Sequence, residues 1–388
     1  MTPVLDDETA RISSVETFLL TPRLALVRIE TDDGLVGWGE PVLEGRSGSV
    51  LQVISEATVL MLGESAHPAR LWQRLYREGF YRGGPVFGSA IAGIDQALWD
   101  LLGKRAGLPV HELLGGPVRD TLTVYAPCHG ETPEELRDRA GALVAAGYRL
   151  MKSSPLGPRE RFEDPAALAM EYQRAAAVRE AIGDDRGFAI DFHGRLSTHS
   201  ARRLLAQLEP LQPTFVEEPI IPELQHELPR LTATTTIPIA TGERLYDRWE
   251  VARIAGTGIS LLQPDLSHCH GISEAVRIAA VASLHDVSVA PHCATGPVAL
   301  AACVQLGFAS HEVTFQECQL NLHDPGRHPA MRVVDHSAFD FVDGALARPT
   351  GPGLGIEVDE ERVRVWADDP DDVPLVRWQH RDGSHAEW

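Results

Sequence analysis

Eight short β-rich runs between residues 123 and 317 restrict the fold of this chain more than any other feature. From Asp191 onward, the polar residues that end these runs lie 22 to 27 residues apart, and the segments between them are rich in Ala, Leu and Arg. This interval is close to one β/α unit, and eight parallel strands close a barrel. We therefore predict an α/β fold built on a TIM-like barrel. The runs are TVYAP, YRLMKS, FAIDF, TFVEEP, IPIATGE, ISLLQPD, VSVAPH and VTFQE.

The first 121 residues mix strand and helix patterns. Two apolar segments flank Asp32-Asp33-Gly34, which predicts a hairpin turn. Residues 89–107 carry apolar side chains at helical spacing, with Ser89 as the expected N-cap and Gly107 as the expected stop. We predict a separate α+β domain over residues 1–121.

The pattern changes again after Glu317, where no helical period follows the last run. The eighth strand is therefore expected to lack its helix, and we assign the barrel to residues 122–350. The tail starts at about Gly351, and its stretch GIEVDEERVRVW (355–366) reads as β-like. We expect residues 351–388 to pack back on the first domain.

Composition excludes several classes of partner. The chain has 35 basic and 55 acidic residues in 388, and its net charge of −20 opposes binding to nucleic acid or to an anionic membrane. An anionic substrate would need a local positive centre. No window approaches the roughly 20 apolar residues of a membrane helix, and the N-terminus lacks a signal-peptide pattern. We expect a cytoplasmic protein, with its five scattered cysteines reduced.

Three carboxylates end three consecutive runs. Asp191, Glu217 and Glu243 are spaced 26 residues apart, and the carboxyl ends of barrel strands meet at one rim. Converging carboxylates repel one another unless a cation lies between them. Mg²⁺ prefers oxygen ligands and keeps positions open for water or substrate. We predict that these three residues bind magnesium, and that Glu218 faces the helices.

Two histidines are candidates for proton transfer. His292 follows a strand, and Asp265 ends the strand before it, so the carboxylate can orient the imidazole as a general base. His193 lies two residues after Asp191, on the same face if the strand continues. Imidazole with an unperturbed pKa near 6.5 can donate a proton to a departing hydroxyl, which makes His193 the expected acid.

A second histidine pair, His268 and His270, forms an HxH motif of the kind found in zinc hydrolases. Those sites use the motif early in the barrel, together with further His and Lys ligands. Here it is late and isolated, so zinc is the less favoured interpretation.

The motifs DFHGR, GERLY and QPDLSH, in this order and spacing, resemble the enolase superfamily in its mandelate racemase branch, and most of all its D-galactonate dehydratase family. Further matching segments, from VGWGEPVLEGR to the closing DGSHAEW, extend the resemblance over nearly the whole chain. The resemblance implies a (β/α)₇β barrel covered by an α+β capping domain made from both chain ends. It also implies a symmetric homo-oligomer.

The resemblance further implies a carbon–oxygen hydro-lyase that removes water from a small sugar acid of the D-galactonate type, giving a 2-keto-3-deoxy acid. The implied site has Mg²⁺ on the three carboxylates, His292 with Asp265 as base, His193 as acid, and Glu317 assisting at the substrate. Lys152 and Ser154 are the expected substrate contacts.

Two places depart from the family pattern. Racemases of this branch carry Lys-X-Lys on the second strand and galactonate dehydratases commonly Lys-X-Asn, whereas this chain has Lys152-Ser153-Ser154. Serine cannot act as a second base, so racemisation is disfavoured. Residues 126–130 also differ. The alternatives are a dehydratase for another sugar acid, such as gluconate, arabinonate or an aldarate, and a catalytically silent sugar-acid-binding protein.

Overall fold

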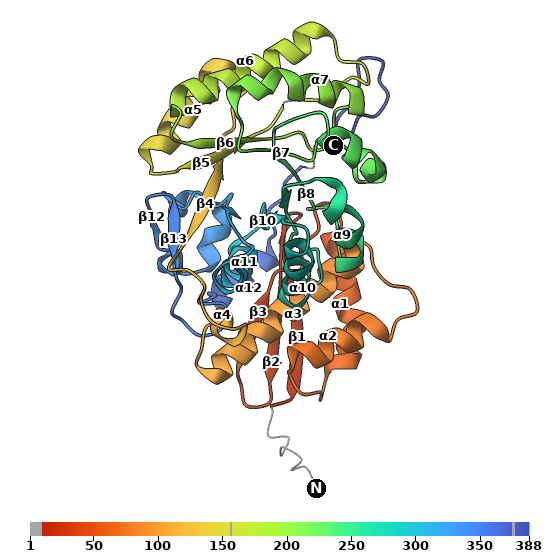
Figure 1. Ribbon diagram of the computed structural model, residues 1–388. Helices are drawn as coiled ribbons and strands as arrows, with labels where there is room; N and C mark the ends of the chain where they lie inside the picture. The colour runs from red at the N-terminus through yellow and green to blue at the C-terminus, as the bar shows by residue number, and fades with distance from the viewer. Residues whose placement is uncertain (1–9, 156, 375–376, 388) are drawn as a thin grey trace.

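The computed structural model describes residues 10–155, 157–374 and 377–387. Figure 1 shows a small N-terminal sheet with its helices at one end of the molecule and the barrel strands above it. None of the described helices is both long and apolar enough to cross a membrane.

The N-terminal unit is a three-stranded antiparallel sheet covered by helices. The predicted turn at Asp32–Gly34 joins its second and third strands and is confirmed. A further turn at Pro22-Arg23 was not predicted, because the flanking residues form one nearly continuous apolar run. The elements are β1 (Ile12–Thr21), β2 (Leu24–Thr31), β3 (Val36–Gly39), α1 (Ser47–Met61), α2 (Pro68–Arg77), α3 (Pro85–Ala106) and α4 (Val110–Leu113).

All eight predicted barrel strands are present and run parallel. The last strand pairs with the first, and a backbone bridge between Val289 and Val313 connects it to the seventh, so the barrel is closed. The strands are β4 (Thr121–Pro127), β5 (Leu150–Ser153), β6 (Gly187–Asp191), β7 (Phe215–Glu217), β8 (Ile239–Thr241), β9 (Leu261–Leu262), β10 (Ser288–Val289) and β11 (Gln316–Glu317).

Apolar side chains fill the interior of the barrel below the strand ends. They come from in or beside every strand, so the barrel is a packed core with a floor beneath its carboxyl-terminal rim. These side chains are Tyr125, Leu150, Ala189, Phe215, Ala240, Leu261 and Ala290, with Phe315 packed against them. The outer helices are α5 (Pro133–Ala145), α6 (Pro165–Ile182), α7 (Thr198–Leu208), α8 (Leu228–Thr232), α9 (Arg248–Ile254), α10 (Ile272–Ser283) and α11 (Pro297–Ala309).

No α-helix directly follows β11 in the described chain, as predicted. Short 3₁₀ turns lead instead to the hairpin β12 (Phe341–Val342) and β13 (Ala345–Ala347), and β13 pairs antiparallel with β4. The fold is thus (β/α)₇β.

The prediction of a β-like tail is wrong for its central part, which is the helix α12 (Glu360–Asp368). Asp359 caps this helix by accepting a hydrogen bond from the Arg362 backbone N–H. Val363 and Trp366, three residues apart, are its buried positions. Val363 and Val365 are two residues apart, as in a strand, whereas the buried pair Val363 and Trp366 is three residues apart, as in a helix. The sequence contains both spacings, and the prediction followed the first.

The tail contacts both units. Arg364 of α12 forms ion pairs with Glu16 of β1. Farther along, the Arg381 backbone N–H and the His380 ring lie 3.4 and 3.6 Å from the Glu160 carboxylate, in the loop after β5. The expectation that the whole tail lies on the N-terminal domain did not include this second contact.

Helix α3 connects the N-terminal unit to the barrel loop after β9. It ends at Gly107 in the left-handed conformation, as predicted, but begins at Pro85 with Gly84 at its N-cap. Ser89 is therefore not the cap. Its hydroxyl lies 2.9 Å from His268 Nδ1.

Candidate active site at the carboxyl ends of the strands

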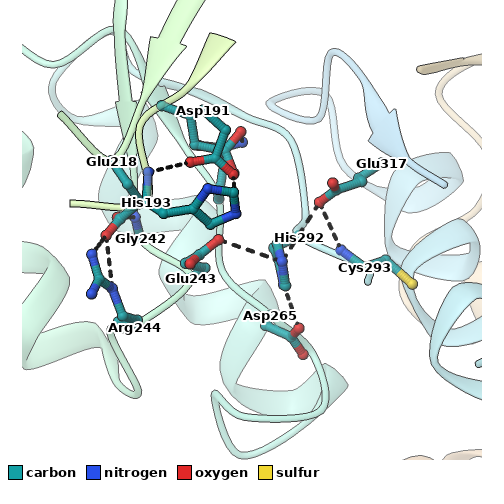
Figure 2. Close-up of polar contacts among 12 residues, drawn as sticks. Asp191, His193, Glu218, Gly242, Glu243, Arg244, Asp265, His292, Cys293 and Glu317 are labelled. Carbon is teal, nitrogen blue, oxygen red and sulfur yellow. Dashed lines mark hydrogen bonds and ion pairs between the residues drawn. The ribbon is translucent and has the colours of Figure 1, made fainter. Parts of the chain in front are cut away.

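The three predicted metal ligands come together at the ends of neighbouring strands. Asp191 pairs in register with Glu217 on β6 and β7, and Glu243 lies just beyond β8. One carboxylate oxygen from each residue lies within 4.8 Å of the others, in a largely buried position. Figure 2 shows Asp191 and Glu243 of this cluster. The strand register thus produces the cluster that the 26-residue spacing predicted.

The ammonium group of Lys152 lies among the same acids. Its Nζ is 2.7 Å from Glu217 Oε1, 2.8 Å from Glu317 Oε1 and 3.5 Å from Asp191 Oδ2. Burial opposes its charge, but the carboxylates of Glu217 and Glu317 outweigh this effect and raise the pKa of Lys152. Lys152 therefore supplies a buried positive charge among these acids.

The acids nevertheless exceed the available positive charge. Burial raises the pKa of Glu243 to about 7, and burial together with the neighbouring Asp191 raises the pKa of Glu217. A divalent cation would relieve this repulsion, and carboxylate oxygens are the ligands that Mg²⁺ prefers. The residues present therefore fit a magnesium ion.

His292 and Asp265 form the predicted pair. His292 Nδ1 lies 2.6 Å from Asp265 Oδ2, and a backbone bridge joins the two residues. On its other side, His292 Nε2 lies 3.4 Å from Glu243 Oε2 and 3.8 Å from Glu317 Oε2. Burial lowers the pKa of His292, but the surrounding carboxylates raise it well above its usual range. A cation among those carboxylates would offset the rise and favour the neutral base.

His193 lies beside Asp191, but not through strand alternation. Strand β6 ends at Asp191, and His193 has a left-handed backbone with φ of 52°. Its backbone N–H donates to Asp191 Oδ1 at 2.8 Å, and its ring Nε2 lies 3.0 Å from Asp191 Oδ2. Burial lowers the pKa of His193 to about 4. The unperturbed pKa assumed from the sequence therefore does not apply to this ring.

Glu317 and Ser154 differ in their placement. Glu317 ends β11 and accepts a hydrogen bond from the Cys293 backbone N–H at 3.1 Å (Figure 2). Its carboxylate also contacts Lys152. Ser154 instead lines a small pocket with residues of α6 and α7, and its carbonyl accepts a hydrogen bond from Arg174. A substrate contact by Ser154 stays a prediction that these contacts do not support.

Glu218 does not face the helices, contrary to prediction. A left-handed backbone with φ of 41° turns it toward the end of β8. There its carboxylate accepts a hydrogen bond from the Thr241 hydroxyl at 2.5 Å. It also accepts hydrogen bonds from the Gly242 N–H at 3.1 Å and from Arg244 Nε at 2.9 Å (Figure 2). It fixes the backbone that carries Glu243.

Two further residues of the site were not singled out from the sequence. Gln263 Nε2 donates to Glu217 Oε2 at 2.6 Å. Because Gln263 precedes Asp265 by two residues, strand alternation could have placed both on one face. Arg195 Nη2 lies 2.8 Å from His193 Nδ1. It stands in the DFHGR motif, but the sequence gives no direction for so long a side chain.

The HxH motif does not form a zinc site. His268 Nδ1 contacts Ser89, whereas His270 Nδ1 lies 2.8 Å from the Tyr246 carbonyl and its ring packs against Trp72 and Tyr76. Within the described residues, the one group of acids, histidines and cysteines that could hold a metal is the carboxylate cluster.

Comparisons with known proteins agree with this geometry. Residues 4–115 match the Mandelate racemase / muconate lactonizing enzyme, N-terminal domain family, and residues 135–362 match the Enolase C-terminal domain-like family. The D-galactonate dehydratase of Xanthomonas euvesicatoria pv. vesicatoria (strain 85-10) is 43% identical over 97% of this chain and 100% of its own length. The D-galactonate dehydratase of Variovorax paradoxus (strain S110) is 44% identical with the same coverage.

Solved structures show the same architecture. A mandelate racemase/muconate lactonizing enzyme from Jannaschia sp. CCS1 superimposes with a TM-score of 0.85 at 30% identity, covering 94% of this chain and 99% of that one. A member of the enolase superfamily from Salmonella Typhimurium gives a TM-score of 0.85 at 26% identity, covering 91% and 97%. These matches confirm the resemblance and the fold predicted from the sequence.

Proposed function

Because the chain belongs to the enolase superfamily, in its mandelate racemase and muconate lactonizing enzyme branch, we propose that it is a magnesium-dependent sugar-acid dehydratase. One observation carries the proposal. Two imidazoles contact one carboxylate triad from different members: His193 lies 3.0 Å from Asp191, and His292 lies 3.4 Å from Glu243. A β-elimination needs a base and an acid at adjacent carbon atoms of one substrate, and this arrangement provides both.

His292 acts as the base. A magnesium ion held by Asp191, Glu217 and Glu243 would neutralise charge on the substrate carboxylate and so make its C2 proton more acidic. His292 Nε2 removes that proton, while Asp265 accepts the hydrogen bond from Nδ1 and stabilises the imidazolium that forms. Lys152 adds positive charge on the same side of the site.

His193 acts as the acid. It donates the Nε2 proton to the hydroxyl on C3 as the C–O bond breaks, and the resulting enol becomes a 2-keto-3-deoxy acid. A neutral imidazole can serve as an electrophilic proton donor, as the neutral histidine of triosephosphate isomerase does. The lowered pKa of His193 is therefore compatible with the role.

The relatives favour a substrate of the D-galactonate type, since both of those named above are D-galactonate dehydratases. Ser154 stands where a racemase would carry its second base, which favours elimination over epimerisation. The departures at 152–154 and 126–130 keep gluconate, arabinonate and aldarates as alternative substrates. We also propose that the protein is cytoplasmic and forms a homo-oligomer. Sedimentation velocity would test the oligomeric state.

The direct test is a substrate screen. Purified protein with Mg²⁺ is incubated with a library of aldonates and aldarates, and 2-keto acid formation is measured. We expect turnover of D-galactonate or a close stereoisomer, its loss after chelation, and its recovery when Mg²⁺ is restored. Absence of product from every acid would favour the silent binding protein, and full activity after rigorous chelation would contradict the magnesium site.

A further inference from the structure

Arg195 links His193 to two segments distant in the chain. Its Nη2 lies 2.8 Å from His193 Nδ1, and its Nη1 donates to the Gly157 carbonyl at 3.2 Å. Its guanidinium also lies 5.8 Å from the ring centroid of Trp378 in the C-terminal tail. We propose that Arg195 is a positioning residue that fixes His193 in the neutral tautomer protonated on Nε2, and that the tail supports it through Trp378.

The hydrogen-bond chemistry allows one assignment of the ring proton. A guanidinium is always charged and can only donate, so His193 Nδ1 must accept and carries no proton in this geometry. The ring proton of His193 then lies on Nε2. That nitrogen is 3.0 Å from Asp191 Oδ2, an acceptor. Both ring contacts therefore agree on the same tautomer.

The position of Arg195 is itself fixed from the tail. Trp378 is half-buried, and the negative face of a tryptophan ring attracts a cation placed over it. The tail is held against the same loop as Gly157, since the Arg381 N–H and the His380 ring both approach Glu160. The loop after β5 and the end of the chain thus hold the guanidinium from two sides.

The consequence for the reaction rests on the proposed function. With the proton on Nε2, His193 presents it toward the metal-binding carboxylates, where the departing hydroxyl would lie. As the C3–O bond breaks, this proton passes to the leaving oxygen and water departs. The guanidinium on Nδ1 offsets the negative charge left on the ring, which later recovers a proton from solvent. Arg195 therefore assists proton donation by His193 and does not assist proton removal by His292.

The tautomer is measured directly by solid-state ¹⁵N NMR on chelator-treated protein labelled at histidine. The resonances of His193 are assigned by their loss in His193→Asn. We expect the neutral Nε2-protonated tautomer in the unsubstituted protein and a change in tautomer population in Arg195→Met. Arg203→Met is the matched control, because Arg203 donates to the Glu163 carbonyl of the same loop. It should leave the His193 resonances unchanged.

Kinetics give the second readout. Arg195→Met should lower elimination at least about tenfold while C2 hydrogen exchange with solvent stays within about twofold, because general acids typically contribute 10²–10⁴-fold. Trp378→Ala should show a smaller change of the same kind.

Three results would overturn the proposal: His193 protonated on Nδ1 in the unsubstituted protein, an unchanged His193 signal in folded Arg195→Met, or equal losses of exchange and elimination. The tautomer of His193 is measured in the unsubstituted protein, without any variant. The proposal can therefore still be refuted if Arg195→Met fails to fold. The NMR measurement gives the tautomer of His193 even if the protein turns over no sugar acid. Failure of this proposal can therefore be distinguished from failure of the dehydratase assignment.

Discussion

The two imidazoles of the site show that neighbouring groups can give the same type of side chain two different chemical roles. Burial alone would lower the pKa of both rings. Around His292 the carboxylates of Glu243 and Glu317 outweigh burial and raise it, whereas at His193 burial prevails and lowers it to about 4. Groups whose pKa values are driven apart in this way are candidates for separate acid and base functions.

Replacing each imidazole should separate the two halves of the reaction. His292→Asn should abolish both C2 hydrogen exchange and elimination, since no base remains at that position. His193→Asn should retain exchange and lose elimination by roughly 10²-fold or more. Exchange is followed by NMR in D₂O and elimination by 2-keto acid formation. Dehydration by His292→Asn at the parent rate would show that the base is assigned incorrectly.

Lys152→Met should destabilise the metal-free protein. The buried ammonium contacts Glu217, Glu317 and Asp191, and breaking a buried ion pair costs roughly 3–5 kcal/mol. We expect the free energy of unfolding to fall by about 3 kcal/mol without metal and by less with saturating Mg²⁺, because the added cation compensates the same acids.

Lys104→Met is the matched control for that measurement, since Lys104 pairs with the buried Asp100 at 2.8 Å, away from the triad. Its loss of stability should be the same with and without Mg²⁺. Chemical denaturation measures both variants. A Lys152→Met deficit that Mg²⁺ leaves unchanged would contradict the idea that lysine and metal neutralise the same charges.

The sequence predicted those residues whose position follows from strand ends. Asp191, Glu217, Glu243, Asp265 and His292 each end or follow a strand, so a periodic pattern places them on one rim. The orientation of a side chain was less predictable where the backbone is left-handed or where the side chain is long. His193 was placed correctly for the wrong reason, Glu218 was placed incorrectly, and Arg195 was not identified as a contact.

At the scale of elements, the end of β3 is joined to the start of α11 by one buried carboxylate. Glu40 is fully buried, and it accepts hydrogen bonds from the Gly296 N–H at 2.5 Å and the Ala299 N–H at 3.0 Å. Helix α11 follows closely after His292, so this contact ties the N-terminal unit to the segment that carries the base. Burial raises the pKa of Glu40 to about 7.

Glu40 should make stability depend on pH in a predictable direction. Its folded pKa of about 7 exceeds its usual value of 4.5, so the folded protein binds more protons between these values. Its contribution to stability is fully present below pH 4.5 and is lost as pH rises through 7, by about 3 kcal/mol in total. Glu40→Gln, which does not titrate, should remove this part of the slope.

Denaturation of both proteins at several pH values between 4.5 and 8 provides the measurement. Other buried acids, such as Asp95 with its pKa of about 7, titrate in both proteins and cancel in the difference. An identical slope in the variant would rule out Glu40 as the source.

The prediction of secondary structure failed in the tail, where the spacing of the apolar residues fits both a strand and a helix. Barrel strands and helices alternate at clear intervals, and all eight strands were placed correctly. In the tail, Val363, Val365 and the intervening Arg364 alternate as in a strand, yet Val363 is buried while Val365 is exposed in α12. The cap at Asp359 is a local helix signal that the strand interpretation did not weigh. The burial of Val363 and Trp366, three residues apart, depends on tertiary contacts that a short sequence window does not show.

At the scale of the whole molecule, the end of the chain returns to the active-site rim. A chain ending at Pro374 would lack the Trp378 ring over Arg195 and the contacts to Glu160. We expect its elimination rate to fall several-fold with C2 exchange largely preserved. Full-length Trp378→Phe, which keeps an aromatic face, should stay near the parent rate. Equal elimination by the shortened and full-length chains would show that the tail has no part in the reaction.

The N-terminal unit is completed by residues from the other end of the chain, and this affects the order in which the protein can fold during synthesis. Asp100 Oδ1 accepts the Leu354 N–H at 2.9 Å, and Arg28 Nε pairs with Glu360 at 3.0 Å. A ribosome releases the first sheet long before either partner exists, and contacts so distant in sequence form slowly. The nascent chain must therefore hold a first domain that lacks these partners until the barrel has been made.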